Sequence, residues 1–283
     1  MPAFSTSRRL SSTPTIRRLT RAECPSGTRI GVFNDLHIGC HDRPAANLAV
    51  ELFEGAGVEV GVANGDIFDC GPVSPHIGKQ RRAAMSNGQL LEEAASGREY
   101  IDWLLTRRLS LLGTGNHEDW INDVAVATNT VGTTTVRSAL GIPNGIEVLP
   151  HGYQIRFGSL VIEHGDIALG RSLGGVNLAQ TILRRYPDQT TIVGHYHRDA
   201  YAVRTSPDAR GVLRSYAAHG IGHLSDPTAH AEYAGRCPDW QQSVGIIEVW
   251  YDGDKPRFTI DHVEIHRTRY GRPIAQYRGR VYR

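Results

Sequence analysis

The sequence predicts an α/β fold in which two β-sheets pack face to face, with helices on the outside. Three observations predict it. In the first half of the chain, short β-prone apolar runs alternate with segments of helical periodicity. The second half consists mainly of short strands of alternating polarity around a single helix. The 283 residues, of which 40% are apolar, are enough for one large domain with a real core.

The first half opens with a βαβ unit. Residues 28–34 (TRIGVFN) form a buried strand, residues 44–57 carry apolar side chains at helical spacing, and residues 58–63 form a second strand. Strands joined by a helix run parallel, so the loops that follow them lie at the same edge of a sheet. In open α/β sheets this edge binds ligands.

The remaining elements follow in order. An irregular Gly-, Pro- and Arg-rich excursion over residues 71–88, placed to cover a site, precedes the next helix. A Gly158-Ser159 turn closes a hairpin in the second half. The expected helices are 89–108, 119–140 (weak, with a Thr-rich interruption) and 176–186; the expected strands are 109–113, 153–157, 160–163, 190–193, 200–204, 212–217, 244–251 and 257–265.

Both ends of the chain are basic. Residues 1–22 hold five Arg and residues 266–283 hold six, and neither segment has an acidic residue. We expect a flexible N-terminal tail (1–22), a catalytic domain (23–265) and a basic C-terminal tail (266–283). Such tails favour an anionic partner such as nucleic acid, although they could equally be solvated ends, and the first could be a transit peptide.

The cysteines and the apolar runs bear on the compartment. The four cysteines have no CxxC spacing, which disfavours a zinc knuckle or a disulfide framework. No apolar run approaches the ~20 residues that a membrane span needs. We therefore expect a reduced, cytoplasmic protein without a membrane-spanning segment.

Five clusters rich in Asp, His and Asn carry the chemistry. Each follows a predicted strand, so folding would bring them to one point. They are Asp35 with His37, Gly65-Asp66 with Asp69, Gly115-Asn116-His117-Glu118, His164-Gly165-Asp166, and Gly194-His195 with His197.

These residue types suit two divalent cations. Carboxylates and imidazoles bind Mn, Fe or Zn, with Mn²⁺ our first expectation, and an Asn carbonyl adds a neutral oxygen. A dinuclear site needs a bridging group, and the two oxygens of Asp66 make it the natural candidate. Two such ions lower the pKa of a bound water and clamp the oxygens of a phosphoryl displacement. His117, next to Asn116, could protonate the leaving group, with Asp69 keeping it charged.

The ordered set resembles the calcineurin-like metallophosphoesterase superfamily, whose pattern is DxH, GDxxD, GNH(D/E), H and GHxH. The resemblance covers residues 35–197, with all five motifs intact. It implies a four-layer αββα fold and a phosphoester substrate. One metal would be held by Asp35, His37, Asp66 and His197, and the other by Asp66, Asn116, His164 and His195. His117 would be the catalytic acid and Asp69 its partner.

The substrate is less determined than the mechanism. The run GDIFDCG (65–71) resembles the DNA-repair exonuclease branch, and the region 239–265 resembles bacteriophage phosphoesterases. Together with the Arg- and Tyr-rich tail, this makes DNA or another nucleic acid the first hypothesis. The alternatives are a nucleotide or other small phosphoester, and a non-catalytic scaffold in a larger assembly. The sequence leaves the roles of Cys70, His219 and His223 open.

Overall fold

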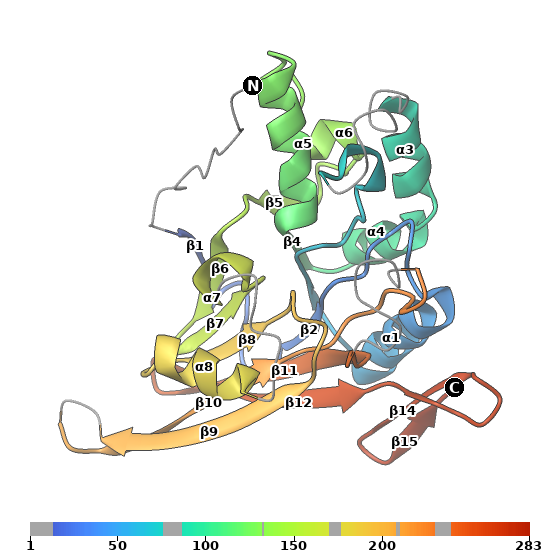
Figure 1. The fold of residues 1–283 in the computed structure, drawn as a ribbon. Helices are drawn as coiled ribbons and strands as arrows, with labels where there is room; N and C mark the ends of the chain where they lie inside the picture. The colour runs from blue at the N-terminus through green and yellow to red at the C-terminus, as the bar shows by residue number, and fades with distance from the viewer. Residues whose placement is uncertain (1–13, 76–86, 132, 170–176, 208–209, 230–238) are drawn as a thin grey trace.

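The computed structural model describes residues 14–75, 87–131, 133–169, 177–207, 210–229 and 239–283. They form two mixed six-stranded sheets that pack face to face, with helices against both outer faces (Figure 1). The predicted α/β fold with two sheets is therefore confirmed. Most of the excursion expected at residues 71–88 lies outside the described residues.

The first sheet contains the predicted βαβ unit. Strands β2 to β5 run parallel, and β11 and β12 extend the sheet antiparallel on the β2 side. In spatial order the strands are β12 (Lys255–Glu264), β11 (Ser243–Asp252), β2 (Arg29–Phe33), β3 (Val60–Asn64), β4 (Leu109–Gly113) and β5 (Glu147–Leu149).

The second sheet mixes parallel and antiparallel pairs. Strands β7, β8 and β10 are mutually parallel neighbours, whereas the β6–β7 hairpin and the β9–β10 pair are antiparallel. In spatial order the strands are β1 (Thr15–Arg18), β6 (Tyr153–Phe157), β7 (Leu160–Glu163), β8 (Thr190–Val193), β10 (Leu213–Gly220) and β9 (Ala200–Pro207).

The helices complete four layers. One apolar cluster joins the first sheet to α1 and α4, a second fills the space between the sheets, and a third joins the second sheet to α8. No helix in the described part of the chain has the length and apolar character needed to cross a membrane. The helical segments are α1 (Arg43–Ala56), η1 (Gly71–Val73), α3 (Asn87–Ala95), α4 (Arg98–Leu105), α5 (Asn116–Ala127), α6 (Val136–Ala139), α7 (Asp166–Leu169) and α8 (Leu178–Arg185).

Local sequence explains where these elements begin and end. Asp42 caps α1 by accepting a hydrogen bond from Ala45 N at 3.2 Å, and Gly57 ends it in the left-handed conformation. The helix expected at 89–108 is instead two helices, α3 and α4. Between them Gly97 lies against Ile38, where a Cβ would come within 2.6 Å of Ile38 Cγ1, so only glycine permits this approach.

The two basic ends are not simple tails, although the division at residues 23 and 265 stays a prediction. In the N-terminal segment, β1 pairs with β6, and Arg17 forms ion pairs with Glu23 and Glu147. The C-terminal segment forms a small sheet of β13 (His266–Arg267), β14 (Pro273–Tyr277) and β15 (Arg280–Tyr282) that packs on α1 (Figure 1). The expectation overlooked the apolar side chains of the C-terminal segment, of which Ala275, Tyr277 and Tyr282 are buried in the core, whereas the apolar side chain of β1, Ile16, is 40% exposed.

Candidate metal centre

The five clusters meet at one edge of the two sheets. They follow the carboxyl ends of β2, β3 and β4 in the first sheet and of β7 and β8 in the second. Main-chain hydrogen bonds fasten the loops together: Asp35 N donates to Gly65 O at 3.1 Å, and Gly194 N donates to His164 O at 3.0 Å. The loops converge because all five strands point the same way at this edge.

The first group of possible ligands contains Asp35, His37 and His197, whose ligand atoms lie within 4.8 Å of one another. His197 Nε2 is 3.3 Å from Asp35 Oδ1 and also 3.3 Å from His37 Nε2. Among the described residues, Asp35 Oδ1 receives no hydrogen bond. His37 Nδ1 lies 3.1 Å from Asp69 Oδ1, an acceptor, so Nδ1 carries the proton and Nε2 offers its lone pair to the site.

The second group contains Asp66, His164 and His195. His164 Nε2 lies 3.1 Å from Asp66 Oδ2 and 3.4 Å from Asn116 Oδ1. The other ring nitrogen of His164 faces the Asn64 carbonyl oxygen at 3.2 Å, which fixes its proton there. His195 Nδ1 is buried and has no hydrogen-bond partner in the described part of the chain.

These distances fit metal coordination. Around an ion with bonds of about 2.1 Å, neighbouring ligand atoms lie about 3.0 Å apart in an octahedron and about 3.4 Å apart in a tetrahedron. The four separations given above, 3.1 to 3.4 Å, fall in this range. Asp66 also forms a group with His37 and His117, so it reaches both halves of the site. The Asp and His clusters are therefore consistent with a dinuclear metal site.

The charges in the site also suit cations. Burial raises the pKa of Asp35, whose side chain has no exposed surface. Burial opposes ionisation of Asp66 too, but His164 and then His117 hold the Asp66 pKa well below its usual value. Burial disfavours the charged form of His37, yet Asp69 raises the His37 pKa to about 9. Cations would take the place of the histidine protons and remove the cost of charging Asp35.

The backbone at the proposed ligands is strained. Each such residue in the left-handed region costs about 1–2 kcal/mol relative to a regular conformation, and strain of this kind gathers at functional sites. Five of the seven proposed ligands have a positive φ: Asp35 (49°), His37 (50°), Asp66 (48°), His195 (65°) and His197 (56°).

Three motif glycines make room for the ligands. A Cβ on Gly65 would overlap the His164 ring, and one on Gly115 would overlap the Asp66 carboxylate. A Cβ on Gly194 would come within 2.6 Å of Asp35 Oδ2. The glycines of GD, GNH and GHxH are therefore required because ligand side chains pack directly against their α-carbons.

Asp69 lies differently from our expectation. His117 Nδ1 is 2.7 Å from the main-chain oxygen of Asp69 but 3.7 Å from its carboxylate, which is closer to His37. The reason is the bond from Asp69 N to Ile38 O, which holds the two loops side by side. Burial lowers the pKa of His117, and the charges of Asp66 and Asp69 oppose that shift. Because the carbonyl oxygen can only accept, His117 Nε2 is the nitrogen left for chemistry.

Glu118 holds the site together, a role that the motif alone did not reveal. It is completely buried, and its carboxylate accepts hydrogen bonds from four main-chain amides. Burial and then the charge of Asp66 raise its pKa to about 7. The donors are Gly115 at 2.8 Å, Asp66 at 3.2 Å, Ile67 at 2.7 Å and Phe68 at 2.9 Å. Glu118 thus ties the loop after β4 to the loop after β3.

Aromatic rings pack against the histidines of the site. Trp120 lies 4.0 Å from the His117 ring, between centroids. In the first group of possible ligands, the His223 ring stacks on the His197 ring with 4.7 Å between centroids, and the Trp240 ring meets the His197 ring edge-on at 4.3 Å. The structure thus brings His223, whose role the sequence left open, into contact with a proposed ligand.

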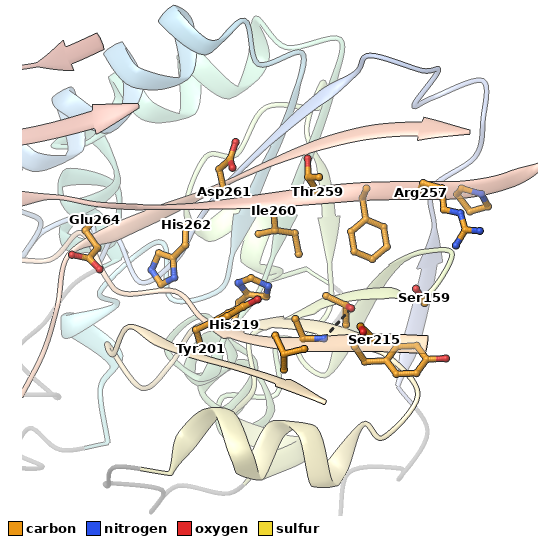
Figure 2. Close-up of a pocket in the computed structure, with 16 residues that line it drawn as sticks. Ser159, Tyr201, Ser215, His219, Arg257, Thr259, Ile260, Asp261, His262 and Glu264 are labelled. Carbon is orange, nitrogen blue, oxygen red and sulfur yellow. Dashed lines mark hydrogen bonds between the residues drawn. The ribbon is translucent and has the colours of Figure 1, made fainter. Parts of the chain in front are cut away.

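His219 lies elsewhere. It lines a groove of about 770 Å³ between β9 and β10 on one side and β12 on the other. Figure 2 shows His219 and Tyr201 on one wall and Ile260 and His262 on the other. Cys70 is fully buried, and burial raises its pKa well above the usual value, so it is not a reactive thiolate.

Comparisons with known proteins add similarity of structure alone. No family model matches the chain, and no curated protein does. Vacuolar Protein Sorting 29 from Cryptosporidium parvum is 13% identical, with a TM-score of 0.40 over 84% of this chain and 99% of that one. A dimetal phosphatase from Danio rerio is 12% identical, with a TM-score of 0.41 over 84% and 96%. The phosphoesterase Yfce from E. coli is 12% identical, with a TM-score of 0.35 over 82% and 98%.

The fold and the site together define an α/β protein with a candidate dinuclear Asp/His metal centre at the carboxyl ends of its strands. At the identities and scores above, the function has to be argued from the geometry of this centre.

Proposed function

We propose that this protein is a phosphoesterase that works with two divalent metal ions. Asp66 carries the proposal, because its carboxylate lies in one ligand group with His164 and His195 and in another with His37, a residue of the first half, as a bridging carboxylate must. The first ion would be held by Asp35, His37, Asp66 and His197, and the second by Asp66, Asn116, His164 and His195. Mn²⁺ is our first choice for both, with Fe or Zn as alternatives.

When bound, two such ions supply an activated water and neutralise charge on the phosphoryl oxygens. The chain's own residues supply position and proton transfer. The ligand atoms of His117, His37 and Asp66 lie within 4.8 Å of one another, which puts the His117 ring at the edge of the site. Its Nε2 is suited to hydrogen-bond a phosphate oxygen and to carry the proton to the leaving group. Asp69 would act on the metal side, by fixing the His37 tautomer.

The C-terminal segment supports nucleic acid as the substrate less than its composition suggests. Of its three tyrosines, Tyr277 and Tyr282 are buried against the core and only Tyr270, which is 74% exposed, could stack on a base. Arg267 pairs with Asp42, and Arg278 pairs with Glu248. We therefore propose a small phosphodiester as the substrate in place of DNA, and the exonuclease-like branch keeps only its sequence resemblance.

The test compares substrates and variants with Mn²⁺ added. Hydrolysis of bis(p-nitrophenyl) phosphate, p-nitrophenyl phosphate, and single- and double-stranded DNA is measured for the wild type. His117→Ala should lose most turnover while keeping its metals, whereas Asp66→Ala should lose both. Glu51→Ala, at an exposed residue of α1 that belongs to none of the proposed sites, is the control and should behave as wild type.

The outcomes separate the proposals. Turnover that survives His117→Ala unchanged would leave His117 without a catalytic role. Metal binding without hydrolysis of any substrate would support the scaffold instead. Efficient cleavage of DNA with no activity on small diesters would restore the nuclease hypothesis.

A further inference from the structure

A second cavity adjoins the metal centre on the side of His197. It has a volume of about 510 Å³, within the range of sites for small organic ligands. Trp240 forms the wall nearest the metal centre, because the same ring that lines the cavity contacts His197. Arg267 and Glu264 line the cavity as well.

The polar groups of this cavity are unevenly satisfied. Asp199 Oδ1 receives hydrogen bonds from Gly222 N at 2.9 Å and Ser243 Oγ at 2.5 Å. Asp199 Oδ2 is buried and has no hydrogen-bond partner among the described residues. An unpaired buried carboxylate oxygen is costly, and a rotation of the carboxylate that turned Oδ2 toward the cavity would let a ligand N–H or O–H group satisfy it.

The charges of the cavity limit the ligand further. Three carboxylates line it, and each has a basic partner: Arg267 pairs with Asp42, His262 lies 3.0 Å from Asp199, and His266 lies 3.2 Å from Glu264. When the two histidines are neutral, the cavity keeps two uncompensated negative charges. Additional phosphates along a polynucleotide would be repelled there. An uncharged group that combines a flat ring with hydrogen-bond donors fits, because the ring can stack on an indole while the donors face the carboxylates.

We propose that this cavity binds the nucleoside part of a nucleotide phosphodiester, with the base against Trp240, while the phosphate lies at the metal centre. This rests on the proposed phosphoesterase function and names its substrate class. Stacking of a base on an aromatic side chain contributes about 1–3 kcal/mol, which corresponds to about 5- to 150-fold in binding.

The test uses two diesters with the same leaving group, the p-nitrophenyl ester of thymidine 5′-monophosphate and methyl p-nitrophenyl phosphate. The wild type should show a kcat/KM at least about tenfold higher for the thymidine ester. Trp240→Leu should remove most of this preference, and Trp240→Phe should restore part of it. Trp250→Leu, at a 40% exposed tryptophan on β11, is the matched control and should keep the preference.

A binding measurement gives a readout independent of turnover. Calorimetric titration with thymidine 5′-monophosphate should give at least about tenfold tighter binding than methyl phosphate, and Trp240→Leu should abolish the difference. Metal content is measured in each variant, because Trp240 contacts His197.

If the wild type hydrolyses neither diester and none of the four substrates in the earlier test, the phosphoesterase proposal fails. If it hydrolyses one of those four but neither diester, only the nucleoside site is refuted. If it hydrolyses both equally well, the phosphoesterase stands and the nucleoside site is refuted. A thymidine preference that persists in Trp240→Leu also refutes it, because the base would then bind elsewhere.

Discussion

Replacing Glu118 by Ala tests how the metal centre is held together. The change leaves Gly115, Asp66, Ile67 and Phe68 with buried amides that have lost their acceptor. At the lower limit of about 1 kcal/mol for each unpaired buried donor, the four amides predict a loss of about 4 kcal/mol in the free energy of unfolding. That is a large part of the 5–15 kcal/mol typical of a domain.

Glu118→Gln gives a graded version of the same change. Its one carbonyl oxygen can still serve two of the amides, but its NH₂ group faces the other two donors, so we expect about half the loss, roughly 2 kcal/mol. Asp123→Ala is the matched control, since Asp123 lies exposed on the same helix α5 and should change stability by less than about 0.5 kcal/mol.

Urea unfolding measures the stabilities, and calorimetric titration with Mn²⁺ measures the metal affinity. Both Glu118 variants should bind Mn²⁺ more weakly, because the loop that carries Asp66 is no longer fixed to the loop that carries Asn116. A Glu118→Ala variant that loses under about 1 kcal/mol and binds Mn²⁺ as well as the wild type would refute this reasoning.

Three further predictions follow from the same contacts. Gly115→Ala should abolish binding of the second ion, because its Cβ would overlap the Asp66 carboxylate. Gly245→Ala, whose Cβ would lie 3.6 Å from its nearest neighbours, is the control and should bind metal normally. Metal analysis of the two variants tests this, and normal metal content in both would contradict the packing argument. Mn²⁺ affinity should fall as the pH is lowered from 9 to 6, by roughly tenfold per pH unit for each displaced proton. The reason is that Asp69, against the effect of burial, raises the His37 pKa to about 9, so protons compete with the metal for this ring. Calorimetry that shows no pH dependence would argue against His37 as a ligand. Burial disfavours the charge on His151, but the hydrogen bonds that its ring donates to Asp119 and Asp166 raise its pKa to about 9, above the unfolded value. The contribution of His151 to stability is therefore complete below about pH 6.5 and lost as the pH rises through 9. Wild-type stability in urea should therefore drop more between pH 7 and 10 than that of His151→Gln, and equal drops would show that this ring is not charged in the fold.

The order of the motifs predicted most of the site because a strand end fixes where the next residues go. β4 and β8 have the predicted bounds, and His195 and His197 after β8 lie in groups of possible metal ligands with residues of the other clusters. Pattern alone could not place Asp69, since the choice between His37 and His117 depends on the bond from Asp69 N to Ile38 O, a contact between two loops. The role of Glu118 was missed because three of its four partners lie about 50 residues away in the sequence.

The structure of the C-terminal segment was harder to predict than the site, for a different reason. A count of arginines emphasised charge, while the alternate apolar side chains of β14 and β15 determine where the C-terminal segment lies. Tyr282 packs so closely on α1 that Gly55 has no room for a Cβ. Short strands with few apolar residues are hard to predict from sequence, because what stabilises them is their packing against the surface that they cover.

The left-handed backbone at the proposed ligands affects which substitutions would be favoured at these positions during evolution. Glycine adopts this conformation without cost, so replacing His195 or His197 by Gly would relieve strain while removing a ligand. At these positions a substitution by glycine would therefore increase stability and weaken metal binding. A lineage freed from the need for catalysis would gain stability by losing ligands one at a time, and would keep the four layers intact. Presence of all seven proposed ligands in this chain is what continued selection on a metal centre would produce.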